Sequence, residues 1–445
     1  MQVRALLAIG LAILTACGPA AVPQAPSPSA AASTAPSASP RDTGRETLAA
    51  NDGWASATTG TSGGAKADAA RVKTVADRQQ LVAALGDPTD AAAKIVYVKG
   101  TIDGNVDEAN KPLRCDDYAT SGYTLDAYLK AFDPAVWGRT KRPSGALEEA
   151  RVASQKKQAA RVQVKVSANT TIVGVGGARL VGLNLVLDQV DNVIIRDLTF
   201  IDAYDCFPQW DPTDGSQGNW NSQYDNISLN GATHVWIDHN AFGDGEHPDA
   251  KQPTYLGRPY QSHDGALDIA KASDMVTVSW NRFADHDKVM LIGSSDTATA
   301  DAGKLNVTIH HNGFSGVGQR TPRVRFGKVD VYDNLYEIPN AAGYTYSWGV
   351  GIEGKLYAEN NVVRLGAGVA PDRFIRAFGG KSIRATGTLV DDGTKRTVAD
   401  MLASYNAAND AKLTDDVGWT PSLRLALDKA EDIASLVAQR AGPRS

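Results

Sequence analysis

A short unit of alternating apolar residues recurs through the middle of the chain and limits how this sequence can fold more than any other feature. Each copy alternates apolar and polar residues over its first half and ends in an aromatic or aliphatic residue, which is typical of a strand with one buried face. Most copies also carry Asn near the seventh place, where an amide tolerates a left-handed turn or bonds to the backbone. The copies are NVIIRDLTF (192–200), HVWIDHNAF (234–242), MVTVSWNRF (275–283), NVTIHHNGF (306–314), KVDVYDNLY (328–336) and KLYAENNVV (355–363).

The spacing of these copies predicts an all-β protein built as a right-handed parallel β-helix. They begin about 20 to 40 residues apart, as stacked rungs with insertions between some of them would. A sandwich or propeller fits the irregular spacing and the single-strand unit less well. Residues 95–102 and 169–177 read as earlier rungs, and the amphipathic segment 75–85 is expected to cap the open end of the stack. Long insertions such as 243–263 are then expected to form the walls of a substrate cleft.

Two other regions are predicted to be helical. Residues 123–161 are rich in Ala, Lys, Glu and Gln, and the chain after Thr397 reads as helix and loop packed along the outside of the stack. The composition fits a turn-rich globular protein, with 42 glycines among 445 residues and 21% charged residues. A net charge of -5 argues against a nucleic-acid partner, and we expect a monomer.

The N-terminus has the features of an export signal. Arg4 precedes an apolar stretch, 5–16, that is too short to span a membrane, and Leu14-Thr15-Ala16-Cys17 resembles the lipobox of bacterial lipoproteins. Residues 1–17 are therefore expected to be a lipoprotein signal, with a lipidated Cys17 anchoring an exported, cell-surface protein. An ordinary signal peptide would make the protein secreted instead.

The segment that follows the signal is dominated by Ala, Ser, Pro, Thr and Gly. Residues 18–65 contain almost no large apolar side chain, so they are predicted to form a disordered tether, with the folded domain spanning 66–445. Cys115 and Cys206 would be the remaining cysteines. In an exported protein they could form one disulfide or be two separate core residues, and their spacing does not decide between these.

One stretch, 262–296, gathers the groups that carry chemistry. Asp264 and Asp268 stand four apart before an apolar strand, and Asp285-His286-Asp287-Lys288 follows that strand. An acidic pair, a strand and a basic group in so short a span indicate a site. Its expected partners are Asp225 upstream and the arginines of 320–325 downstream.

Five motifs in order give the chain a family resemblance. WNSQYDNISL (220–229), VWIDH (235–239), HDGALDI (263–269), HDKVMLIGSSD (286–296) and RTPRVRFGKV (320–329) together resemble the pectate lyases of polysaccharide lyase family 1. Agreement in order and spacing extends from about residue 95 to residue 421. Enzymes of this family cleave polygalacturonate (pectate) by β-elimination: the C5 proton is removed, and the glycosidic oxygen at C4 leaves to give 4,5-unsaturated oligogalacturonates.

The resemblance implies a calcium site. Its protein ligands would be Asp225, Asp264 and Asp268, since Ca²⁺ prefers several oxygen ligands with carboxylates among them. Many relatives carry a further acid two residues before the position of Asp225, where this chain has Gln223. We therefore expect fewer protein carboxylates, with the substrate completing the site.

The resemblance also assigns roles to three basic residues. Lys288 would bind the uronate carboxylate, Arg320 would be the catalytic base and Arg325 would bind substrate. Arginine is an unusual base because its pKa lies above 12. A cleft with a bound Ca²⁺ and neighbouring cations would favour loss of its proton.

Alternative functions lead to different expectations. A polygalacturonase-type hydrolase would need a set of catalytic carboxylates, one of them protonated, and would leave Arg320 without a role. A pectin lyase would dispense with the calcium acids, and a pectin-binding surface module would lose a catalytic group. His239, His310 and His311 are expected to be structural, whereas Trp210 and Trp220 are candidates for contact with sugar.

Overall fold

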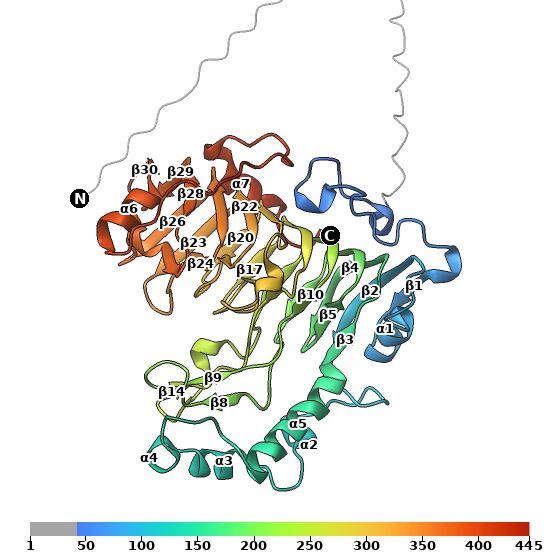
Figure 1. Cartoon of the computed structure of the whole chain (residues 1–445). Helices are drawn as coiled ribbons and strands as arrows, with labels where there is room; N and C mark the ends of the chain where they lie inside the picture. The colour runs from blue at the N-terminus through green and yellow to red at the C-terminus, as the bar shows by residue number, and fades with distance from the viewer. Residues whose placement is uncertain (1–41, 445) are drawn as a thin grey trace, which may run out of the picture. The chain divides into compact units, whose positions relative to one another are not determined.

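The computed structural model describes residues 42–444, which form a parallel β-helix with a lobe beside it (Figure 1). The strands pair in three parallel ladders, as a coil with three faces requires. The long strands β2 (Lys94–Asp103) and β4 (Thr170–Val181) bend from the first ladder into the second, which joins these two ladders in one 18-stranded sheet. The third ladder is a separate 8-stranded sheet. The predicted fold class is confirmed.

The three ladders run in chain order, so each rung adds one strand to each. The first contains β1 (Val72–Val75), β2, β4, β6 (Asp191–Arg196), β11 (Thr233–Asp238), β16 (Asp274–Ser279), β19 (Val307–His310), β22 (Lys328–Tyr332), β25 (Lys355–Glu359) and β28 (Ile383–Thr386). The second contains β7 (Thr199–Ile201), β12 (Ala241–Gly243), β17 (Arg282–Ala284), β20 (Gly313–Ser315), β23 (Leu335–Asn340), β26 (Val362–Ala367), β29 (Thr388–Asp391) and the antiparallel β30 (Arg396–Ala399). The third contains β3 (Gln163–Lys165), β5 (Asn184–Asp188), β10 (Ile227–Asn230), β15 (Leu267–Ala270), β18 (Leu291–Ile292), β21 (Arg323–Val324), β24 (Trp348–Gly351) and β27 (Ile375–Phe378).

Each repeated unit of the sequence spans two strands, not the single strand we expected. The chain bends between the first and second ladders at a residue with positive φ, such as Trp280 (φ 55°), and the recurring Asn follows it. These asparagines stack: Asn281 Nδ2 donates to Asn312 Oδ1 (3.0 Å) and to the carbonyl of Ile237 (2.9 Å). The amide therefore bonds along the stack while its neighbour takes the left-handed conformation.

The inside of the coil is a continuous apolar core. Phenylalanines at equivalent places stack from rung to rung, with ring centroids 4.7 Å apart for Phe242 and Phe283. The predicted capping helix is α1 (Arg78–Leu85), which inserts Leu81 and Leu85 into the N-terminal end of this core. At the opposite end, α6 (Met401–Ala408) packs against the core, and α7 (Ala430–Arg440) covers part of the second ladder. No helix within residues 42–444 is both long and apolar enough to cross a membrane.

The folded domain begins earlier than we predicted. Residues 42–65, assigned to the tether, pack on the outer face of the first ladder, where Ala55 is fully buried and its N–H donates to Thr277 Oγ1 (3.0 Å). A Cβ on Gly64 would lie 1.9 Å from the carbonyl oxygen of Lys94, so the close approach requires glycine there. Residues 42–65 are mostly small and are held against the ladder by hydrogen bonds from their backbone. Their composition is therefore like that of a linker. The rest of the tether and the signal, 1–41, lie outside the described residues.

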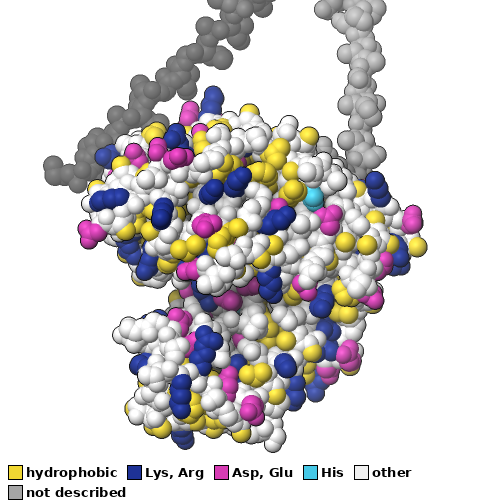
Figure 2. Space-filling model, in the orientation of Figure 1, with side chains coloured by type: hydrophobic (Ala, Val, Ile, Leu, Met, Phe, Trp, Pro, Cys, Tyr) yellow, Lys and Arg dark blue, Asp and Glu magenta, His cyan; other side chains and the backbone are white. Residues whose placement is uncertain are grey.

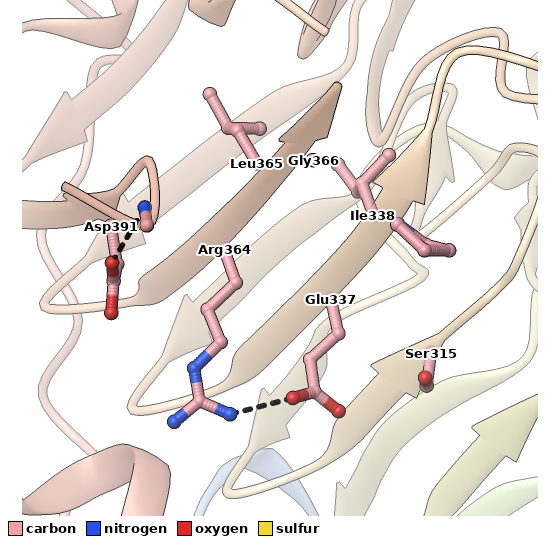
Figure 3. Close-up of a pocket in the computed structure, with 9 residues that line it drawn as sticks. Ser315, Glu337, Ile338, Arg364, Leu365, Gly366 and Asp391 are labelled. Carbon is pink, nitrogen blue, oxygen red and sulfur yellow. Dashed lines mark hydrogen bonds and ion pairs between the residues drawn. The ribbon is translucent and has the colours of Figure 1, made fainter.

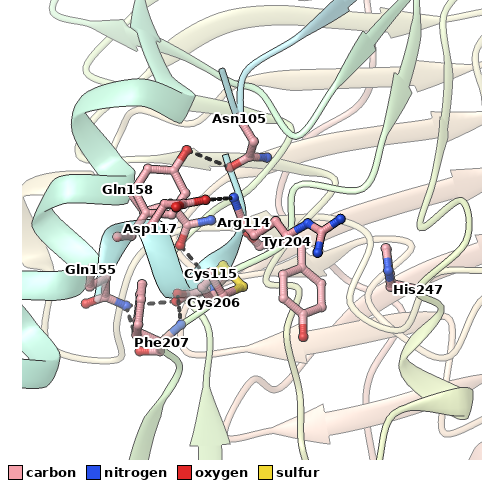
Figure 4. The surroundings of a disulfide bond; sticks show 12 residues. Asn105, Arg114, Cys115, Asp117, Gln155, Gln158, Tyr204, Cys206, Phe207 and His247 are labelled. Carbon is pink, nitrogen blue, oxygen red and sulfur yellow. Dashed lines mark hydrogen bonds between the residues drawn. A yellow bond between two sulfur atoms is a disulfide. The ribbon is translucent and has the colours of Figure 1, made fainter. Parts of the chain in front are cut away.

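The lobe consists of insertions that precede strands of the third ladder. It contains α2 (Cys115–Tyr118), α3 (Leu125–Ala131), α4 (Pro134–Trp137), α5 (Ala146–Val162) and the short hairpins β8 (Gln209–Asp211)–β9 (Asn219–Asn221) and β13 (Thr254–Tyr255)–β14 (Arg258–Pro259). The expected helical region 123–161 is thus present as α3 to α5, with a break at 138–145. Cys115 and Cys206 form a disulfide that joins α2 to the segment before β8 (Figure 4). This settles the pairing that the sequence left open.

Candidate active site

Asp225, Asp264 and Asp268 come together at the edge of the third ladder. Asp225 precedes β10, Asp264 precedes β15 and Asp268 lies within β15, so neighbouring rungs supply them. They surround Gly265, whose N–H donates to Asp225 Oδ1 (2.9 Å). A Cβ at Gly265 would lie 2.4 Å from Asp268 Oδ1 and 2.9 Å from Asp225 Oδ1, so glycine leaves room for the two carboxylates to converge.

The electrostatics of these three acids favour a bound cation. Burial, together with the charges of Asp268 and Asp264, raises the pKa of Asp225 well above its ordinary value. Burial and the Asp264 carboxylate raise the pKa of Asp268 to about 7. Crowded carboxylates share a site only if protons or cations neutralise them. This all-oxygen donor set therefore fits a hard divalent cation.

Lys288 and Arg320 complete the charge pattern on the next two rungs. Isolated bridges pair Gly265 with Lys288 and Lys288 with Gln319, which places Arg320 beside the acids. Lys288 is 7% exposed, and its Nζ lies 2.8 Å from Asp264 Oδ1. Burial alone would raise the pKa of Asp264. The positive charges of Lys288 and, to a smaller extent, Arg320 outweigh burial and hold this pKa below its ordinary value.

Arg320 lies beside the acids with one guanidinium nitrogen unpaired. It takes a left-handed conformation (φ 63°), and its Nε is buried without a hydrogen-bond partner. Among the described residues Arg320 forms no ion pair closer than 4 Å, but the carboxylates of Asp268 and Asp264 interact with it electrostatically. Burial lowers the pKa of this guanidinium, but the two carboxylates outweigh burial and hold that pKa above its ordinary value.

The other two arginines of the motif share the outward face of β21 and the residue after it. Val324 between them is fully buried, so Arg323 and Arg325 both face away from the core. Arg325 Nη1 donates to the carbonyl of Gly293 (2.9 Å), and its Nε pairs with Asp296. The Gly293 carbonyl and the Asp296 carboxylate thus fix the position of the Arg325 guanidinium.

The neighbouring residues differ in exposure. Trp210 and Trp220 have no exposed surface and lie in the aromatic core of the lobe, so the prediction that they contact sugar is wrong. Gln223 is exposed, and its N–H donates to Asp205 Oδ2 (2.9 Å). Figure 2 shows the molecule hollowed between the lobe and the β-helix, with acidic and basic side chains gathered in the hollow.

The histidines lie in stacks and ion pairs. His311 stacks on Trp280 (ring centroids 4.2 Å apart), and its Nε2 lies 2.8 Å from Asp428 Oδ2. Two groups in residues 42–444 place three possible ligand atoms within 4.8 Å of one another: Asp244, Asp249 and His263, and His311, Asp333 and Asp428. Despite burial, contacts with Asp202 and Asp249 raise the pKa of His263 to about 10, which favours a cationic ring paired with these carboxylates.

A separate surface groove of about 440 Å³ lies on the second ladder, away from these residues in the fold (Figure 3). Glu337 on β23 and Arg364 on β26 form an ion pair across its floor, and Asp391 of β29 lies at one side. It contains no residue of the predicted site. The charged cluster on the third ladder is the better candidate for chemistry.

Comparisons with known proteins agree with this geometry. A family model described as pectate lyase matches residues 141–412. A pectate lyase of Bacillus subtilis is 50% identical over 406 residues, which cover 90% of this chain and 94% of that protein. Pectate lyase E of Dickeya chrysanthemi is 36% identical over 366 residues, covering 80% and 79%.

Solved structures give the same result. A mutant of the Bacillus subtilis pectate lyase has a TM-score of 0.85 at 49% identity, covering 91% of this chain and 99% of that one. A pectate lyase bound to a hexasaccharide matches with the same values. The parallel β-helix, with acids, a lysine and arginines on one ladder, places the chain in the β-helix class, and the matched relatives in that class are lyases. The chain belongs to the pectate lyase family, and it is a lyase of that family.

Proposed function

We propose that this enzyme is a calcium-dependent pectate lyase that cleaves de-esterified polygalacturonate by β-elimination. The approach of Asp225 and Asp268 at Gly265, with Asp264 beside them paired to Lys288 and with Arg320 next to the acids, carries this proposal. The acids would hold a cation, and the basic groups would face an anionic sugar. The hexasaccharide that a related pectate lyase binds supports a polymeric substrate.

Calcium suits the donor set because the acids offer only oxygen. Asp225, Asp264 and Asp268 would hold Ca²⁺, which would supply positive charge to stabilise the negative charge that develops on the uronate carboxylate. Lys288 would bind the same carboxylate from the protein side. Gln223 adds no charge to the site, so substrate oxygens would complete the coordination.

Arg320 is the proposed base for the C5 proton, and Arg325 is a proposed substrate-binding residue. The carboxylates of Asp268 and Asp264 hold the pKa of Arg320 high in the metal-free protein. A divalent cation on these acids would cancel their field, so the arginine would lose a proton more readily when the site is loaded. The base is therefore expected to work at alkaline pH and only with the metal bound.

The test follows ultraviolet absorbance of polygalacturonate, since an unsaturated product absorbs and a hydrolysis product does not. We expect absorbance to rise with Ca²⁺ and to stop with EDTA. Arg320→Lys should lower kcat by about 10²- to 10⁴-fold, the range for removal of a general base. An Arg320→Lys enzyme with unchanged kcat would exclude this residue as the base.

We propose that the protein is exported and anchored at the cell surface through a lipidated Cys17, acting there as a monomer. The lipobox supports this, and a disulfide is typical of exported proteins. Cys17→Ser should move the protein from the membrane fraction to the soluble fraction. Unchanged membrane association would contradict the lipid anchor, and a dimer in size-exclusion chromatography would contradict the monomer.

A further inference from the structure

An outward-facing row of the third ladder leads from the acids to two further arginines. Leu291, whose N–H bonds to Asp268, is in register with Arg323, then Gly349, then Arg376. Neighbouring strands lie about 4.8 Å apart, so Arg376 is roughly 19 Å along the coil from Asp268. That distance corresponds to several sugar rings.

Arg323 and Arg376 both stack on Phe378. The guanidinium carbon of Arg323 lies 4.0 Å from the centre of the Phe378 ring, and that of Arg376 lies 5.2 Å from it. Tyr346 packs against the same ring at 5.0 Å between centroids. A Cβ on Gly349 would come within 2.8 Å of the Tyr346 ring and 3.0 Å of Arg323 Cγ, so glycine keeps this strand clear between the two arginines.

These two arginines carry charge that the protein does not neutralise. Within residues 42–444 neither forms an ion pair with an acid, in contrast to Arg325, which pairs with Asp296. The Nε of Arg323 is buried without any hydrogen-bond partner. Burial, then Arg325 and Arg320, lower the pKa of Arg323, which reflects a local excess of positive charge. A bound carboxylate would relieve this excess.

We propose that Arg323 and Arg376, both packed on Phe378, form a distal subsite that binds a uronate carboxylate of the substrate chain. This proposal rests on the proposed function, because a polyuronate supplies carboxylates at regular intervals. The subsite lies several sugars from Asp268. It therefore acts only on chains long enough to reach it and affects binding, not the chemical step.

The test compares Arg376→Ala with the wild type on hexagalacturonate and trigalacturonate. The subsite predicts a KM for hexagalacturonate raised roughly tenfold, the scale of one lost charge-assisted hydrogen bond, with kcat unchanged and little effect on trigalacturonate. Arg376→Lys should recover part of the loss. Arg384→Ala is the matched control, because that partly exposed arginine lies on β28 of the first ladder, pairs with Asp415, and should leave both constants unchanged when removed.

Calorimetry of hexagalacturonate binding in EDTA separates this proposal from the proposed function. Affinity that falls in Arg376→Ala supports the subsite even if the wild type releases no unsaturated product, an outcome that would overturn only the lyase assignment. Equal affinity and equal KM in Arg376→Ala and wild type would overturn the subsite while leaving the lyase assignment intact. A drop in kcat for both substrates would also overturn it, since that would be a general structural effect.

Discussion

The ammonium of Lys288 lies 2.8 Å from a carboxylate oxygen of Asp264, across neighbouring rungs of the β-helix. The lysine thus stands between a proposed calcium ligand and the place where the substrate carboxylate would bind. Both side chains are held by the strand register, because the bridge between Gly265 and Lys288 fixes their relative height. One ammonium can therefore neutralise Asp264 and attract the sugar acid.

Removal of Lys288 is expected to weaken catalysis strongly. Lys288→Ala should reduce kcat/KM by about 10- to 100-fold, since a charge-assisted hydrogen bond contributes about 1.5–3 kcal/mol. Lys288→Arg should retain more activity because it keeps the charge. Lys304→Ala serves as the control, since Lys304 is an exposed lysine near Asp274. Steady-state kinetics check this, and wild-type kcat/KM in Lys288→Ala would contradict it.

Calcium affinity should depend on pH through Asp268. Its pKa of about 7 in the metal-free protein means that binding must displace a proton below that pH, so affinity should fall by up to about tenfold per pH unit. Isothermal titration with Ca²⁺ between pH 5 and pH 8 measures this. A calcium affinity that is constant over this range would contradict the crowding of the three acids.

The same shift predicts how stability varies in EDTA. Folding raises the pKa of Asp268, so between about pH 4 and pH 7 the native state binds a proton that the unfolded state does not. This proton stabilises the native state at low pH, and the stabilisation is lost as pH rises from about 4 to about 7. Asp268→Asn should remove this part of the slope. Thermal unfolding across this pH window checks it, and identical slopes for the two proteins would rule it out.

The asparagine stack is expected to contribute to stability without affecting chemistry. Asn281→Ala would leave the N–H of Asn240 and the carbonyl of Ile237 without their partner. Each buried group left unpaired costs about 1–3 kcal/mol. Urea unfolding should show this loss, whereas Asn340→Ala, at an exposed position, should unfold like the wild type. Equal stability of the two variants would contradict the stack's role.

The disulfide is expected to stabilise the lobe. Cys115 and Cys206 are separated by 91 residues, and removal of such a link costs about 2–5 kcal/mol in small secreted domains. Replacing both with Ser should increase hydrogen exchange in α2 and in the segment before β8, and leave the rungs protected. Protection lost equally in β19 would show that the lobe and the coil unfold as one unit.

The rungs could be predicted because their information is local. Alternation in 275–283 gives the buried face of β16, and the acids Asp264 and Asp268 were placed ahead of it; that Asp268 lies within a separate strand, β15, was not predicted. Their convergence with Asp225 then requires only that successive rungs stack in register. The family motifs supplied the roles that spacing alone does not give.

The rest depended on contacts between distant rungs. Residues 42–65 have the composition of a linker because the residues that pack against the ladder are small. Burial of Trp210 depends on aromatic partners far along the chain. Arg376 attracts no notice in the sequence, since its position beside Arg323 arises only through the register with Gly349.

The most direct test of the central claim counts unsaturated ends and reducing ends in parallel during digestion of polygalacturonate. Elimination creates one of each at every cleavage, so the account predicts equal numbers in Ca²⁺ and neither in EDTA. Reducing ends that accumulate without ultraviolet absorbance would mean hydrolysis and would contradict the assignment of Arg320 and the three aspartates.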